Sequence, residues 1–142
     1  MFRAMTAALL LAALGGAPGL AASAACAGAD PAIVSVTVKG VSPSSGLNNY
    51  ELTGTVVNNG SAQDSNVLQF VDILQNGQKL DAKAVPPLAA GQSYTFTYVS
   101  QRSKDAGLGS SKLTFQMDVT QPSGVPNAAD CDASNDSFTL TF

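Results

Sequence analysis

The chain has 142 residues and a formal net charge of −3 at pH 7, and only 12% of its residues are charged. A mildly acidic surface without basic clusters repels phosphate backbones, which argues against nucleic acid as a partner. The length is typical of a single domain with its own hydrophobic core.

The first two dozen residues have the organisation of a secretory signal peptide. Arg3 is followed by an unbroken Ala/Leu run at residues 7–14 and a small-residue cleavage site at residues 22–24. Glycine and proline break the apolar stretch before it reaches the roughly 20 residues that span a bilayer. We therefore expect a signal peptide over residues 1–24 and one domain over residues 25–142. The protein is then periplasmic or secreted, with no transmembrane segment after cleavage.

The chain contains two cysteines, Cys26 behind the expected cleavage site and Cys131 ahead of the last predicted strand. In an oxidising compartment we expect them to form a disulfide that joins the mature N-terminus to the C-terminal part of the domain. The alternative is a lipoprotein anchored at Cys26. Lipoprotein signals usually have an aliphatic residue where this chain has Ser23, which favours the disulfide.

Apolar and polar residues alternate in short runs from residue 33 to residue 142, separated by Gly, Asn and Pro, a pattern typical of half-buried antiparallel strands. The predicted strands span residues 33–39, 50–58, 67–74, 79–85, 93–99, 113–120 and 138–142. This spacing predicts an all-β fold, an immunoglobulin-like antiparallel β-sandwich of about seven strands.

The first two strands carry specific expectations. In the first, Val34, Val36 and Val38 should share one face, and residues 40–49 should form a loose connection to the second strand. The second strand should end at residues 58–60, an Asn-Asn-Gly sequence that accepts left-handed backbone angles. Within that strand, Leu52 and Val56 are expected inside with Gly54 between them.

Asn76-Gly77 is the strongest hairpin signal, because both central positions of a type I′ turn need a positive φ. The strand that follows, residues 79–85, ends at two prolines and is expected at a sheet edge. In the next strand Tyr94, Phe96 and Tyr98 share a face, so we expect them in the core and not on a sugar-binding platform.

Three motifs carry a family resemblance. Asn59-Gly60 follows a Val/Thr strand, residues 88–92 (Leu-Ala-Ala-Gly-Gln) lead into alternating Tyr and Thr, and residues 132–137 (Asp-Ala-Ser-Asn-Asp-Ser) lead into the last strand. This order resembles the CARDB domain, the cell-adhesion-related domain found in bacteria, although Asp136 stands where the family commonly has Asn. The resemblance implies a seven-stranded immunoglobulin-like or fibronectin-like sandwich on an exported protein. Residues 52–60 also resemble the FxLYD domain of exported bacterial proteins.

The residue inventory argues against an enzyme. The chain has no histidine, which removes Ser-His-Asp and Cys-His nucleophile systems, His-ligated zinc and the commonest general base. Glu51 is the only glutamate and is interpreted as an exposed strand residue. We therefore expect no catalytic residues and no organic cofactor.

The segment before the last strand is the best candidate site for a metal. Its carboxylate and amide oxygens are hard ligands of the kind that Ca²⁺ prefers. The candidate ligands are Asp130, Asp132, Asn135 and Asp136. The alternative is that these side chains cap turns, since the segment lacks the Gly and terminal Glu of an EF-hand loop.

Two classes of function remain open. The first is a binding or adhesion module that recognises a protein or glycan of the cell envelope through its loops or through an edge strand, residues 79–85. Lys79 and Lys83 on that edge also oppose uncontrolled strand addition. The second is a structural component of a periplasmic or cell-surface assembly.

Overall fold

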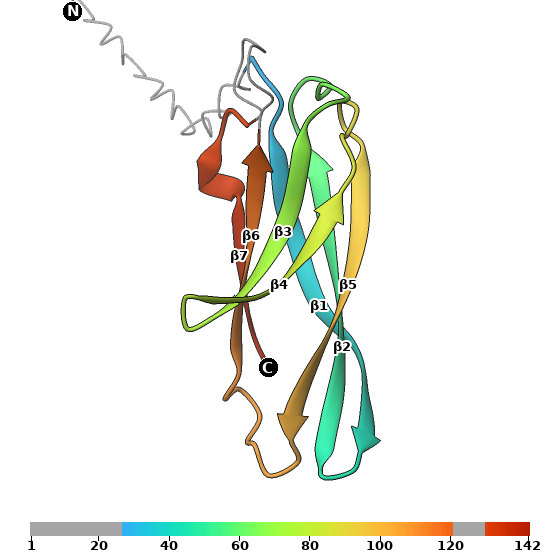
Figure 1. Ribbon diagram of the computed structural model, residues 1–142, viewed down its shortest axis with the longest axis vertical. Coiled ribbons are helices and arrows are strands. Elements are labelled where there is room, and N and C mark those ends of the chain that lie inside the picture. The colour runs from blue at the N-terminus through green and yellow to red at the C-terminus, as the bar shows by residue number, and fades with distance from the viewer. Residues whose placement is uncertain (1–26, 121–129) are drawn as a thin grey trace, which may run out of the picture.

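The computed structural model describes residues 27–120 and 130–142, which form two facing β-sheets (Figure 1). The expected signal peptide, Cys26 and residues 121–129 lie outside the described residues. The strands are β1 (Pro31–Ser44), β2 (Leu47–Asn58), β3 (Leu68–Gln75), β4 (Gln78–Val85), β5 (Ser93–Ser103), β6 (Lys112–Thr120) and β7 (Ser137–Thr141). A 3₁₀-helix, η1 (Ala133–Asn135), precedes β7.

One sheet has the strand order β1-β2-β5 and the other has the order β4-β3-β6-β7. All the pairings are antiparallel, so the prediction of an all-β antiparallel sandwich with seven strands is confirmed for the described residues. The core between the sheets consists of Ile33, Val36, Tyr50, Leu52, Val56, Val71, Ile73, Val85, Leu88, Phe96, Leu113, Phe115 and Met117.

The expected loose connection over residues 40–49 is wrong. β1 continues to Ser44, which pairs with Leu47 at the start of β2, so the two strands form one long hairpin. Gly46, with φ of 73°, supplies the positive φ of its tight turn. Pro43 is tolerated inside β1 because β1 is an edge strand with one side unpaired.

The valines of β1 do not share one face. A β-bulge just after Ile33 shifts the alternation, so Val36 is 2% exposed while Val34 is 49% exposed. A second bulge follows Val38, which is 38% exposed. A bulge adds one residue to one strand and bends it, and the sequence pattern alone does not show where this happens.

Gly54 is needed because the ring of Phe96, on neighbouring β5, occupies the space of its missing side chain. A Cβ at Gly54 would lie 2.1 Å from Phe96 Cζ. Leu52 and Val56 on either side are fully buried, as predicted. The ring of Phe96 packs against Phe115 of the opposite sheet at 5.9 Å between centroids. This contact joins the two sheets at the centre of the core.

The turn between β3 and β4 is formed as predicted, with φ of 52° at Asn76 and 79° at Gly77. β2 ends at Asn58, as predicted, although none of residues 58–60 uses the positive φ that these residue types accept. Instead, the fully buried Asn58 side chain accepts a hydrogen bond from Asp30 N (2.9 Å) and donates one to Leu88 O (3.0 Å). These bonds join three chain segments at one end of the sandwich.

Candidate functional site

The acidic segment, residues 130–136, contains the predicted calcium ligands Asp130, Asp132, Asn135 and Asp136. Asp132 is the N-cap of η1, and its carboxylate accepts hydrogen bonds from Ser134 N (3.0 Å) and Ser134 Oγ (2.6 Å). The hydrogen bonds from Ser134 lower the pKa of Asp132. Asp132 therefore caps a turn, as the alternative reading expects.

Asn135 and Asp130 also form hydrogen bonds within the domain. Asn135 Nδ2 donates to Asp30 Oδ1 (2.8 Å), which lies just before β1. Asp130 Oδ1 accepts from Asp132 N (3.1 Å). The segment before β7 is therefore joined to the beginning of the domain through side chains that are far apart in the sequence.

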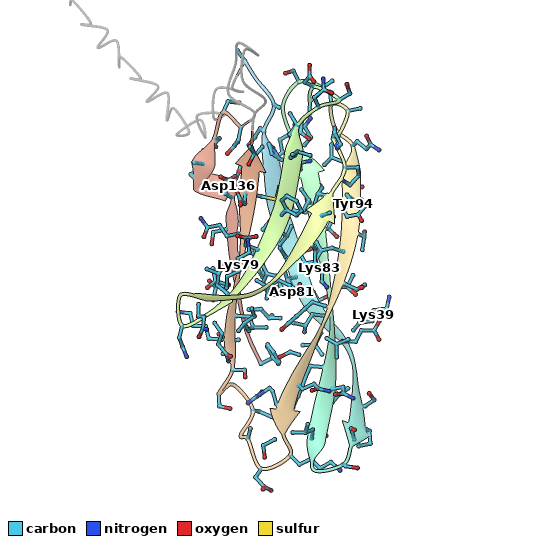
Figure 2. All side chains as sticks on the ribbon, viewed as in Figure 1. Lys39, Lys79, Asp81, Lys83, Tyr94 and Asp136 are labelled. Atoms are coloured by element: carbon cyan, nitrogen blue, oxygen red, sulfur yellow. The ribbon has the colours of Figure 1, made fainter. Side chains whose placement is uncertain are left out.

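Asp136, labelled in Figure 2, differs from the other three because other acidic side chains lie close to its carboxyl group. Burial, a hydrogen bond with Asp130 and the nearby charges of Asp130, Asp30 and Asp132 raise the pKa of Asp136 to about 7. Its Oδ1 atom, like Asn135 Oδ1, is buried without a hydrogen-bond partner among residues 27–120 and 130–142. Asp136 is therefore largely protonated below neutral pH.

Calcium binding at this segment stays a prediction. Among residues 27–120 and 130–142, no group of three or more His, Cys, Asp or Glu side chains is arranged to hold a metal ion. In this segment the buried side-chain oxygens that lack a hydrogen-bond partner among the described residues are Asn135 Oδ1 and Asp136 Oδ1, whereas Ca²⁺ takes six to eight oxygen ligands.

Cys131 lies beside the beginning of the domain. Its backbone N donates to Ala29 O at 2.9 Å, and Ala29 is only three residues after Cys26. No free cysteine occurs in the described part of the chain. Because Cys26 lies outside that part, the Cys26–Cys131 disulfide stays a prediction, and so does the alternative of a lipid anchor at Cys26.

The three tyrosines do not form a sugar-stacking platform. Tyr50 is 8% exposed, and its ring lies 5.1 Å from the ring of Phe142. Tyr94 and Tyr98 are half-buried and pack against the core, as their shared strand face predicted. Aromatic stacking on a sugar ring therefore has no exposed tyrosine pair available.

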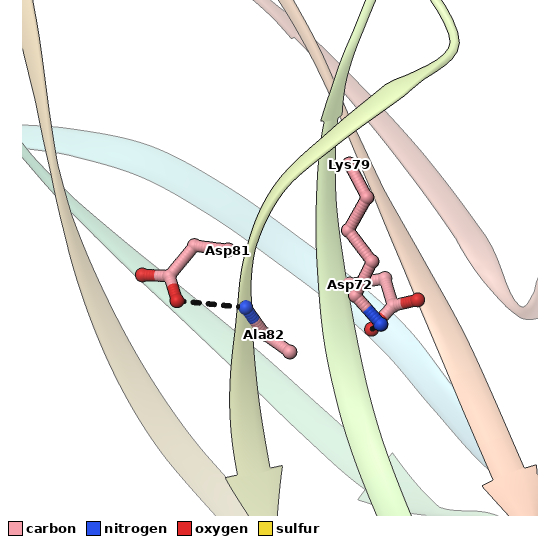
Figure 3. Close-up of polar contacts among 4 residues, drawn as sticks. All are labelled: Asp72, Lys79, Asp81 and Ala82. Carbon is pink, nitrogen blue, oxygen red and sulfur yellow. Dashed lines mark hydrogen bonds and ion pairs between the residues drawn. The ribbon is translucent and has the colours of Figure 1, made fainter.

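Strand β4 is an edge strand, as predicted. Lys79 Nζ lies 2.7 Å from the carboxylate of Asp72 on β3. Asp81 Oδ1 accepts from Ala82 N at 2.8 Å (Figure 3). Charged side chains therefore surround β4, the edge strand at which strand addition was considered.

Lys83 also connects β4 to the other sheet. Its Nζ lies 2.7 Å from Asp81 Oδ2 and 5.7 Å from the ring centre of Tyr98 on β5. The hydrogen bond from Lys83 lowers the pKa of Asp81, and burial raises the pKa of Tyr98. These contacts occupy one of the two lysines of the β4 edge.

The loop between β5 and β6, residues 104–111, has a well-anchored base and an exposed tip. The buried Arg102 side chain donates to Gly107 O (3.0 Å) and to Ser110 Oγ inside this loop. At the tip, Leu108 is 91% exposed. No pattern in the sequence indicates that Arg102 holds this loop.

A depression of about 390 Å³ lies on the outer face of the β1-β2-β5 sheet. Its lining residues are Gly40, Val41, Ser42, Asn49, Glu51, Thr97 and Val99. Sequence reasoning missed this site because it placed residues 40–49 in a loop and treated Glu51 as an isolated strand residue. The period-two pattern of polar residues in β2 and β5 was visible, but the bulge that shapes β1 was not.

Two antiparallel sheets of three and four strands place the protein in the class of immunoglobulin-like β-sandwich domains. A family model, CARDB, matches residues 32–122, which is more than half of the chain. The chain therefore belongs to the CARDB family, a cell-adhesion-related domain of bacteria. Two of the three sequence motifs lie within the matched residues, and the third, residues 132–137, lies beyond them. No curated protein and no solved structure matches the chain. Within the described residues there is no helix of the length and apolarity that a membrane span needs.

Proposed function

We propose that this protein is an exported bacterial module that binds or adheres and does not catalyse, with a protein or glycan of the cell envelope as its partner. The observation that carries the proposal is the CARDB match over residues 32–122. The absence of histidine from the sequence supports a non-catalytic role.

The loop of residues 104–111 supports recognition through loops. A contact residue binds with less entropic cost when its backbone is already fixed. Arg102 fixes this loop at its base, and Leu108 offers an apolar side chain that is 91% exposed. By contrast, the charged side chains around β4 disfavour strand addition there, so the loop is the better candidate contact.

The proposal is tested by direct binding to the envelope. Fluorescently labelled protein is titrated with envelope fragments of the source bacterium, and we expect saturable binding that unlabelled protein competes. Leu108→Ser should weaken it, while Leu80→Ser, at a leucine that is 46% exposed on β4, serves as the matched control. Absence of saturable binding contradicts the module; equal effects of the two variants contradict the role of the loop.

The alternative function is a structural component of a periplasmic or cell-surface assembly. The long edge strand β1, with Val34 49% and Val41 52% exposed, favours it. Sedimentation velocity over a range of concentrations separates the two functions. A module stays monomeric until its partner is added, whereas an assembly component forms larger species by itself.

Export is tested by the intact mass of the protein purified from its native envelope, before and after reduction and alkylation. We expect a chain that starts near residue 25, is two hydrogens lighter than the reduced form, and is alkylated twice only after reduction. An added mass of a diacylglycerol and an acyl chain would instead establish a lipoprotein anchored at Cys26.

A further inference from the structure

The depression on the outer face of the β1-β2-β5 sheet has a structural origin. β1 bulges between Val38 and Gly40, and Gly40 then lies directly opposite Glu51 of β2. On the other side of Glu51 is Val99 of β5. A bulge bends its strand, and the glycine adds no side chain, so the sheet is hollowed at this row.

The glycine is not required by the fold itself. A Cβ at Gly40 would meet no atom of the described residues within 4 Å, and the φ of Gly40 is not positive. Gly54 on the inner face of the same sheet is the opposite case, because there a Cβ would collide with Phe96. The space above Gly40 is therefore open and available to a ligand.

The polar groups around this space include both a hydrogen-bond acceptor and a hydrogen-bond donor. Glu51 is exposed and has no salt bridge in the described part of the chain. Asn49 Oδ1 accepts from Gln101 Nε2 (3.1 Å), which leaves Asn49 Nδ2 to donate. The depression therefore offers a carboxylate acceptor and an amide donor that the protein does not pair with each other.

The walls of the depression add apolar surface and hydroxyl groups. Val99, which pairs with Glu51, is 53% exposed and lines the depression with its apolar side chain. Ser42 and Thr97 contribute hydroxyl groups that can donate or accept hydrogen bonds. Sites for small ligands commonly combine a concave shape, apolar walls and a few polar groups that fix orientation.

We infer that this depression binds an N-acetylated amino sugar unit of a glycan. The acetamido N–H would donate to Glu51, the acetamido carbonyl would accept from Asn49 Nδ2, and the methyl group would pack against Val99. Ser42 and Thr97 would bond ring hydroxyls. This inference rests on the proposed binding function and selects glycan from its two partner classes.

The test is a titration of the purified protein, followed by its backbone amide NMR signals, with diacetylchitobiose, cellobiose and N-methylacetamide at equal concentrations. We expect saturable shifts with diacetylchitobiose at residues 40–42, 49–51 and 97–99. Cellobiose lacks the acetamido group and N-methylacetamide lacks the ring, so both should shift these signals less. Equal shifts with cellobiose overturn the acetamido assignment, and equal shifts with N-methylacetamide overturn the sugar assignment.

Variants locate the site. Gly40→Val fills the depression and should abolish the shifts, and Glu51→Gln should weaken binding about tenfold through loss of a charged acceptor. Thr95→Val changes a residue that is exposed on the same face but does not line the depression, and it should bind normally. Normal binding by Gly40→Val overturns the site.

The outcome is separable from that of the envelope titration. Saturable envelope binding without sugar shifts removes the glycan site and leaves the module in place. If diacetylchitobiose shifts the NMR signals but the protein does not bind envelope fragments, the glycan that it recognises is not on the envelope, which would contradict the proposed partner.

Discussion

The acidic segment of residues 130–136 and the depression on the β1-β2-β5 sheet are opposite kinds of surface. The first gathers its polar residues in one stretch of sequence, and the second collects them from three strands. In the acidic segment, Asp132 caps a 3₁₀-helix and Asn135 holds Asp30, so these polar groups are used by the fold. In the depression, Glu51 is exposed and has no salt bridge among the described residues.

The difference shows that polar density along the chain is a poor guide to binding. Short-range clusters of Asp, Ser and Asn commonly satisfy their own backbone. Strand residues with period two put their polar groups on one face of the sheet, where they need not satisfy the backbone of their own strand. The following predictions test whether the acidic segment is structural and the depression is dispensable for folding.

The largest effect is expected at Cys131. If Cys131 is bonded to Cys26, Cys131→Ser should lower the free energy of unfolding by about 4–5 kcal/mol, because a loop of about 100 residues is released. Urea unfolding of the oxidised wild type, the reduced wild type and the variant measures it. The reduced wild type should match the variant; a variant as stable as the oxidised protein contradicts the disulfide.

A pair of glycine substitutions compares the two faces of the β1-β2-β5 sheet. Gly54→Val should cost about 3 kcal/mol, because its side chain overlaps the ring of Phe96. Gly40→Val should stay within about 0.5 kcal/mol of the wild type, because its side chain enters open space. Thermal unfolding of both variants measures the difference, and equal losses contradict the open depression.

The fold was predictable from sequence because its signals are local. Alternation identified the strands, Asn76-Gly77 identified a hairpin, and Gly54 lay between two inward residues as expected. β-bulges are the exception, since one extra residue reverses the facing of everything after it. The errors at Val34 and over residues 40–49 both come from the bulged β1 hairpin.

The sites were less predictable because they depend on contacts between distant segments. The contact between Asp30 and Asn135 joins residues 105 positions apart. The raised pKa of Asp136 depends partly on Asp30. No pattern in the sequence shows that Asp30 lies close to Asp136. The sequence therefore identified an acidic segment but not the cluster of carboxyl groups around Asp136.

That crowding predicts a pH dependence. The pKa of Asp136 rises from 3.8 to about 7 on folding, so the folded state holds a proton that the unfolded chain loses. Asp136 should therefore reduce stability progressively as pH rises from about 4 to about 7, with no further change above. The exposed part of the carboxyl group limits the loss to about 1 kcal/mol. Asp136→Asn should raise the melting temperature at pH 8 and flatten this slope.

Asp132→Asn is the control of opposite sign. The hydrogen bonds from Ser134 lower the pKa of Asp132, so its contribution is present at neutral pH and is lost as pH falls below its value in the unfolded chain. A variant at Asp132 should therefore be less stable than the wild type at pH 8. Identical pH profiles for the two variants contradict this account of the segment.

Calcium should have a smaller effect on the melting temperature, and only if the acidic segment binds it. If the acidic segment binds Ca²⁺, the ion should raise the melting temperature more at about pH 8 than at about pH 5, because Asp136 must lose its proton to become a ligand. A chelator should reverse the rise. An unchanged melting temperature at both pH values, with and without calcium, would mean that the carboxylates only cap and join the chain.

The smallest effect is expected at Glu51. Because it is exposed and has no ion pair among the described residues, Glu51→Gln should change the free energy of unfolding by less than about 0.5 kcal/mol. Denaturant unfolding of the variant, compared with Asp136→Asn at the same pH, measures this. A substantial loss would mean that Glu51 is used by the fold like the acidic segment. If Glu51→Gln weakens sugar binding but leaves the free energy of unfolding almost unchanged, then the Glu51 carboxylate contributes to ligand binding and not to the stability of the domain.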